Sequence, residues 1–146
     1  MAEISPITAK GPLAQAMASA ASGMRAEAMR ARLVSENLAN ANSTATGAGG
    51  NPYQRKIMTF AQAVDQATGA GVVKPGPTAT DDTPFRSEYD PSHPAADANG
   101  YVKLPNVSEL VEEADMREAE RSYEANLASM NQARSMFSKT LDILKA

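Results

Sequence analysis

The stretch MREAERSYEANLASMNQARSMFSKTLDIL, residues 116–144, decides the fold of this chain. It contains no Gly or Pro, so nothing in it interrupts a helix. Its apolar and small residues recur over 28 positions in eight intervals, a mean spacing of 3.5, which is typical of a helix packed lengthwise on another helix. This predicted seam consists of Met116, Ala119, Tyr123, Leu127, Met130, Ala133, Phe137, Leu141 and Leu144.

Upstream, the helix is predicted to begin at residue 107. Asn106 follows Pro105 and is predicted to cap the helix, with Glu109 three residues on in a reciprocal arrangement. We therefore expect one helix over residues 107–146.

A second helix is predicted over residues 13–42. Gly11 and Pro12 supply its start, because Pro at the first helical position loses no useful donor. Spacings of four and three favour packing on another helix, with Glu27 as a misfit in the seam formed by Leu13, Met17, Ala20, Met24, Glu27, Ala31, Val34 and Leu38.

The sequence LVSENLANANST, residues 33–44, contains three asparagines whose amides compete with helical hydrogen bonding. One interpretation makes Asn37, Asn40 and Asn42 simple punctuation at the end of the helix. The other has Asn37 and Asn40 bonding to a neighbouring backbone or to the partner helix.

Residues 43–106 contain most of the Gly and Pro and are predicted to form an extended arm with a small β-hairpin. QRKIMTF and YVKL are the expected strands, and Asn99-Gly100 is a hairpin-turn signal before the second. VVKPGPTATDDTP is interpreted as linker. Residues 1–12 are expected to be disordered. The predicted fold is mainly α, with two long terminal helices packed as a coiled coil and this extended arm between them in the sequence.

Composition excludes several classes of function. A formal charge of −3, with Lys and Arg scattered among carboxylates, argues against nucleic acid as a partner. No apolar run is long enough to span a membrane, and residues 1–12 lack the apolar stretch of a cleavable signal peptide. Absence of cysteine removes thiol chemistry and Cys-ligated zinc.

No catalytic, cofactor or metal site is predicted. His93 is the only histidine and lies between Ser92 and Pro94, which favours a turn-packing role. The aspartates of the arm lack the spacing of a calcium loop and are expected to form turns: Asp81, Asp82, Asp90 and Asp97. We expect no enzyme, no cofactor and no small-molecule substrate.

Several motifs carry a family resemblance. ASAASGM, SENLANANSTATG and NPYQRK resemble the amino-terminal signature of bacterial flagellar rod and hook proteins, and PNVSELVEEADMREAERSYEANL resembles their carboxy-terminal one. The central SEYDPSHPAADANGYVKLPNV is similar to the short proximal rod members of this family. The resemblance covers roughly residues 13–146.

This resemblance implies a structural subunit of the flagellar basal body. Members of the family polymerise through their terminal helices into a rod that spans the periplasm and transmits torque for motility. The implied partners are further copies of the chain, other proximal and distal rod subunits, the rod base adaptor, the MS ring and the flagellar type III export apparatus. Export through that apparatus needs no cleavable signal.

The predicted assembly interface lies on the two helices. It comprises Leu13, Met17, Met24, Val34, Asn37, Leu38, Asn40, Tyr123, Asn126, Leu127, Met130, Phe137, Leu141 and Leu144. Two alternatives remain: a coiled-coil adaptor or needle-like secretion protein, which would form a defined small oligomer, and an enzyme, which would need a convergent polar pocket.

Overall fold

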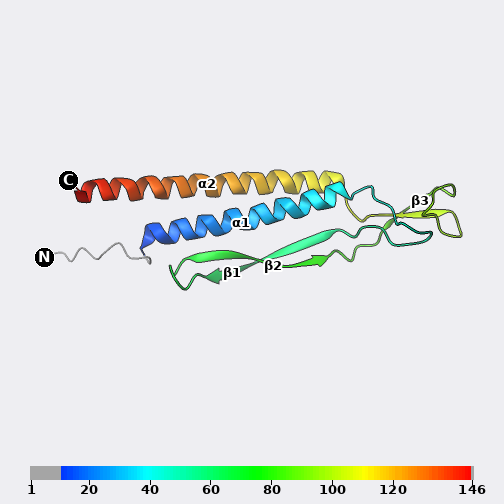
Figure 1. Cartoon of the computed structure of the whole chain (residues 1–146), viewed down its shortest axis with the longest axis horizontal. Helices are drawn as coiled ribbons and strands as arrows, with labels where there is room; N and C mark the ends of the chain where they lie inside the picture. Colours follow the sequence, from blue (N-terminus) through cyan, green and yellow to red (C-terminus); the bar gives the residue numbers. More distant parts are fainter. Residues whose placement is uncertain (1–10, 146) are drawn as a thin grey trace. The chain divides into compact units, whose positions relative to one another are not determined.

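A computed structural model describes residues 11–145 and contains two long helices and four strands (Figure 1). In chain order these are α1 (Pro12–Ala39), β1 (Lys56–Val64), β2 (Gly71–Thr80), β3 (Arg86–Tyr89), β4 (Tyr101–Leu104) and α2 (Glu109–Lys145). The mainly helical class with β-structure between the helices is confirmed, whereas coiled-coil packing stays a prediction. Of the segment expected to be disordered, residues 1–10 lie outside the described residues and Pro12 already begins α1.

Helix α1 ends three residues before the predicted boundary at residue 42. The amide of Asn40 donates to the carbonyl of Glu36 at 2.8 Å, and the backbone N–H of Ser43 reaches the carbonyl of Asn40 in the turn that follows. Asn side chains that bond their own backbone terminate a helix in this way. Asn40 therefore marks the end of α1, as the first of the two interpretations of these asparagines has it.

Helix α2 begins at Glu109, and the prediction that Asn106 caps it is wrong. The backbone N–H of Glu112 donates to the carbonyl of Ser108 at 3.0 Å, which places Ser108 at the N-cap position. The side chain of Asn106 instead binds segments far away in the sequence, and this tertiary demand overrides its capping tendency.

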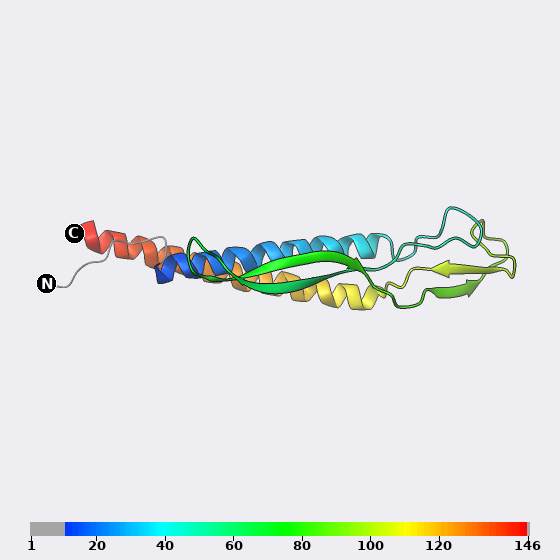
Figure 2. The same cartoon turned by 90° about the horizontal axis from the view of Figure 1, so that it is seen from below.

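Strands β1 and β2 form a two-stranded antiparallel hairpin whose arrows point in opposite directions (Figures 1 and 2). The prediction of β1 is confirmed, but the interpretation of VVKPGPTATDDTP, residues 72–84, as linker is wrong as far as Thr80, where β2 ends. Pro75 and Pro77 suggested a linker because proline cannot donate to a sheet ladder. In a two-stranded sheet each strand has an open edge, where proline is tolerated.

A second hairpin pairs β3 with β4 in antiparallel register, from Arg86 opposite Leu104 to Tyr89 opposite Tyr101. The partner of YVKL therefore lies before the proline-rich loop, and the arm contains two hairpins rather than the single one predicted. Gly100 has a φ of +83° in the returning turn, and a Cβ there would lie 2.9 Å from the ring of Tyr89.

The loop between β3 and β4 is built from the turn-forming residues that were predicted. Asp90 Oδ1 accepts hydrogen bonds from the N–H and hydroxyl of Ser92, and Asp97 Oδ1 accepts from the N–H groups of Asn99 and Tyr101. His93 Nδ1 accepts from the N–H of Ala95 at 3.0 Å, which confirms its role in turn packing.

The residues divide into two compact units, and both helices and the β1–β2 hairpin contribute to each. One unit combines α1 as far as Met29, Phe60–Gly76 of the hairpin and α2 from Ala119 onward. The other combines Arg30–Thr59 with Pro77–Glu118, and so contains the β3–β4 hairpin.

Of the seam predicted for α2, only Ala119 and Ala133 are fully buried. Glu112, Ala119 and Ala133 are nearly inaccessible and recur at multiples of seven, with the half-buried Asn126 between them. By contrast, Leu127 is 40% exposed and Leu144 54% exposed. Ala119, Asn126 and Ala133 keep most of this stripe small, Glu112 is its one large buried member, and large apolar side chains are left at the surface.

Candidate functional site

The unit formed by Arg30–Thr59 and Pro77–Glu118 contains a buried polar network with Asn37 at its centre. Asn37 Nδ2 donates to the carbonyl of Lys56 at 2.9 Å and to Glu112 Oε2 at 3.0 Å. Its Oδ1 accepts from the hydroxyl of Tyr53 at 2.8 Å and from the N–H of Lys56 at 2.9 Å. An amide can make four such hydrogen bonds, so Asn37, only 1% exposed, is fully satisfied.

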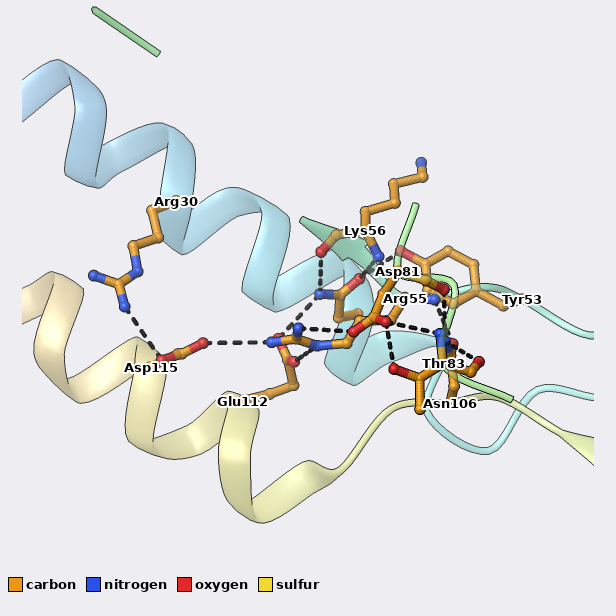
Figure 3. A network of polar contacts seen from close by, with 10 residues as sticks. Arg30, Tyr53, Arg55, Lys56, Asp81, Thr83, Asn106, Glu112 and Asp115 are labelled. Atoms are coloured by element: carbon orange, nitrogen blue, oxygen red, sulfur yellow. Dashed lines mark hydrogen bonds and ion pairs between the residues drawn. The ribbon is translucent and has the colours of Figure 1, made fainter. Parts of the chain in front are cut away.

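Glu112 is a carboxylate with no solvent exposure, and Arg55 compensates its charge. Arg55 Nε lies 2.5 Å from Glu112 Oε1, its Nη1 lies 3.3 Å from Asp81 Oδ2, and its Nη2 lies 3.5 Å from Asp115 Oδ2 (Figure 3). A buried charge is tolerated only when it is paired and hydrogen-bonded. One guanidinium therefore joins the start of α2 to the segments that precede β1 and follow β2.

The side chain of Asn106 makes three further hydrogen bonds to the segments that precede β1 and follow β2 (Figure 3). Its Oδ1 accepts from the backbone N–H of Arg55 at 2.7 Å, and its Nδ2 donates to the carbonyls of Asp81 and Thr83, each at 2.9 Å. We call this set of residues the hairpin root: Asn37, Tyr53, Arg55, Lys56, Asp81, Asn106 and Glu112. It connects α1, both ends of the β1–β2 hairpin and the start of α2.

Within this unit, ion pairs continue along the facing helices. Arg30 of α1 lies 3.2 Å from Asp115 and 3.6 Å from Glu118 of α2. Lys56 pairs with Glu36 and lies over the ring of Tyr53 at 5.8 Å. Charged contacts thus complement small-residue packing where α1 and α2 meet.

The protonation states at the root are those of a structural network. Burial, with smaller contributions from Glu36 and Glu112, raises the pKa of Tyr53 to about 12, so its hydroxyl remains a donor at neutral pH. Burial lowers the pKa of Arg55, but the contacts with Glu112 and Asp81 outweigh it and the net pKa is raised. Hydrogen bonds from Thr83 and Arg55 hold the pKa of Asp81 below its ordinary value, so it stays a carboxylate. These residues are set to hold one arrangement rather than to exchange protons.

Among residues 11–145, no cluster of His, Asp or Glu has the arrangement needed to hold a metal ion. Neither described helix is long and apolar enough to cross a membrane.

In the other unit, α1 is held against the hairpin and α2 by close contacts. The hydroxyl of Ser19 donates to the carbonyl of Gly71, and the hydroxyl of Ser22 accepts from the N–H of Val73 at 3.1 Å. A Cβ on Gly23 would lie 2.7 Å from the amide of Asn126, so only glycine fits here without displacing that side chain. The ASAASGM motif thus supplies the small residues that this approach requires.

The residues of the predicted assembly interface occupy three kinds of environment. Asn37 and Val34 are buried, Asn126 packs against Gly23, and Asn40 bonds within its own helix. The exposed members are Tyr123, Leu127 and Leu144. Partly exposed are Leu13, Met17, Met24, Leu38, Met130, Phe137 and Leu141.

For Asn37, the interpretation that its amide bonds to a neighbouring backbone and to the other helix is confirmed. Its side-chain partners Tyr53 and Glu112 were missed, and so was Arg55, which pairs with Glu112. A signal was present for Glu112, because a carboxylate begins the heptad series that continues with Ala119, Asn126 and Ala133. Arg55 carried no comparable signal, since its partners lie 26 and 57 positions away.

Known proteins resemble this chain over most of its length. Residues 98–143 match the family described as flagellar basal body rod FlgEFG protein C-terminal. The chain is 49% identical over 135 residues to the flagellar basal-body rod protein FlgC of Agrobacterium fabrum, covering 92% of this chain and 97% of that protein. The chain belongs to the FlgC family of flagellar basal-body rod proteins.

Two further relatives match most of the chain as well. The FlgC proteins of Salmonella typhimurium and Bacillus subtilis are 41% and 39% identical, and the matches cover 85% and 86% of this chain and 92% and 93% of those proteins. The resemblance found in the sequence motifs is thereby confirmed. Membership of the FlgC family makes the chain a structural component of the flagellar basal-body rod, which serves motility and assembles with other basal-body proteins.

Proposed function

We propose that the chain polymerises through α1 and α2 as a subunit of the proximal rod and transmits torque along it. The observation that supports this most strongly is that large apolar side chains are exposed along α2, on more than one of its faces: Tyr123, Leu127, Met136, Ile143 and Leu144. Exposed apolar area of this kind is stabilised when neighbouring subunits remove it from water. The helices would then pack as coiled coils in the assembled rod.

The hairpin root suits a part under mechanical load. Arg55, Asn37 and Asn106 tie the β1–β2 hairpin to both helices through several hydrogen bonds at once. A twisting force on one of these segments is then shared with the others. In this proposal α1 and α2 are the rod helices, and the residues between them form the arm.

The proposed partners are further copies of the chain, other proximal and distal rod subunits, the rod base adaptor and the MS ring. The chain would reach them through the flagellar type III export apparatus, without a cleavable signal peptide, and the rod would span the periplasm. The two helices supply the assembly interface predicted from the sequence.

Deletion and complementation in the organism that encodes this chain test the proposal. We expect the deletion strain to be non-motile, with basal bodies whose rod stops short, and the restored chain to be present in purified basal bodies. A swimming deletion strain with complete rods would contradict the proposal. A chain found only as a defined small oligomer would also contradict it and would favour the adaptor alternative.

A further inference from the structure

One exposed stripe of α2 carries an ordered series of charges. Glu113, Glu120, Leu127 and Arg134 recur every seven residues, and each directly follows a member of the stripe Glu112, Ala119, Asn126 and Ala133. At about 100° per residue they therefore lie on the neighbouring face of the helix. All four are exposed.

Charge changes sign along this helix. Residues 109–126 contain seven carboxylates and two arginines, whereas residues 127–145 contain Arg134, Lys139 and Lys145 with Asp142 as the single carboxylate. On the exposed stripe, Glu113 and Glu120 precede Leu127, and Arg134 follows it. One end of the stripe is thus the electrostatic complement of the other.

We propose that this stripe binds a second copy of the chain, in parallel orientation and shifted by two heptads. This inference rests on the proposed function. The shift, about 21 Å at about 1.5 Å per residue, brings Glu120 of one copy opposite Arg134 of the next. Each copy then offers an acidic end to one neighbour and a basic end to another, so the contact repeats without closing.

The same shift matches apolar residues. Leu127 meets Leu141, Tyr123 meets Phe137 and Met130 meets Leu144, because each pair is separated by the same 14 positions as Glu120 and Arg134. These residues are exposed or only half-buried in the single chain. Charge therefore sets the register of the contact, and apolar burial stabilises it.

Charge reversal on the purified full-length chain tests the contact. Sedimentation velocity at low salt should show concentration-dependent association of the native chain. Glu120→Arg or Arg134→Glu should weaken it about tenfold, because an attraction becomes a repulsion. Mixing the two variants, or combining both changes in one chain, should restore association, since each restores opposite charges across the contact.

Lys139→Glu is the matched control. It makes the same change of charge in the same half of α2, but it lies five residues from Arg134 and so about 140° around the helix. Its association should equal that of the native chain. A native chain that stays monomeric, single reversals without effect, or a mixture that fails to recover would each overturn the proposal.

Cross-linking separates the parallel contact from an antiparallel dimer centred on Leu127. The chain contains no cysteine, so introduced thiols are its only ones. The doubly substituted Glu120→Cys, Arg134→Cys chain should give a ladder of oligomers on oxidation, and Leu127→Cys alone should give no efficient cross-link. An antiparallel pair would reverse both results, stopping at dimers in the first case and cross-linking readily in the second.

Complementation keeps this inference separate from the proposed function. If the native chain restores motility and both charge-reversed single variants do so equally well, the rod function stands and the stripe contact is overturned. If the native chain fails to enter the rod, the function itself is wrong, whatever the purified chain does.

Discussion

At the scale of single residues, Asn37 shows why an amide is suited to the hairpin root. Two of its hydrogen bonds need a donor, and two need an acceptor. A carboxylate of the same shape can satisfy only the second pair.

We therefore predict that Asn37→Asp is strongly destabilising. It removes the donors to Lys56 and Glu112 and places a second negative charge about 3 Å from the first, for which a cost of about 3–5 kcal/mol is typical in a buried network. Urea unfolding followed by circular dichroism measures the loss. Asn42→Asp is the matched control, because Asn42 also donates to a glutamate, Glu109, but at an exposed position. Equal losses for the two variants would contradict the role given to Asn37.

The raised pKa of Tyr53 predicts that the stability of the fold depends on pH in the alkaline range. Because its pKa is raised from 10.0 to about 12 on folding, its contribution to stability is fully present below pH 10 and is lost as the pH rises through about 12. Ultraviolet absorbance should show one of the four tyrosines ionising last, and Tyr53→Phe should remove that step. The variant should also be less sensitive to alkaline unfolding. An unchanged titration curve in Tyr53→Phe would refute this assignment.

At the scale of elements, the contact between α1 and α2 at Gly23 determines how closely the helices approach. Glycine inside a helix costs about 1 kcal/mol relative to alanine. That cost is offset here because no Cβ stands between the α1 backbone and the amide of Asn126.

A double-mutant cycle isolates this contact. Gly23→Ala should destabilise the native chain, since its Cβ would displace the amide of Asn126, yet it should stabilise the Asn126→Ala chain by about 1 kcal/mol. Thermal unfolding followed by circular dichroism at the helical band measures the stability of the native chain, the two single variants and the double variant. If Gly23→Ala changes stability in the same direction in both backgrounds, close packing at Asn126 does not explain why glycine is present at position 23.

The elements also show what the sequence could predict. Both helices followed from periodicity, because it is a local property that the helix itself enforces. β2 did not, because Pro75 and Pro77 are local signals against a strand, while the pairing that overrides them lies in β1. Similarly, Asn37 could be singled out as an unusual amide, but its partners come from distant segments that only folding brings together.

At the scale of the whole molecule, the end of α2 is predicted to be an assembly surface. Deleting residues 137–146 removes Phe137, Leu141 and Leu144, each large apolar side chain being worth about 1.5–3 kcal/mol when buried by a neighbour. We expect the shortened chain to be made and secreted but absent from the rod, leaving cells non-motile. Immunoblots of purified basal bodies and of the medium measure how much of the shortened chain enters the rod and how much is secreted.

Substitution tests the same surface without removing the segment. Glutamine at Phe137, Leu141 and Leu144 should have the effect of the deletion, whereas glutamine at the exposed Ser138, Lys139 and Asp142 should leave motility intact. Normal amounts of the first variant in rotating basal bodies would show that the end of α2 is dispensable.

The hydrogen bond between Asn37 and Glu112 joins positions 75 residues apart. Since Glu112 also neutralises Arg55, the hairpin root cannot be completed until most of the chain, as far as α2, is available. Closing so long a loop is slow compared with forming a local turn. A chain emerging from a ribosome or from a narrow conduit therefore remains open until its second helix arrives, and the order in which its residues appear sets the moment at which it can fold.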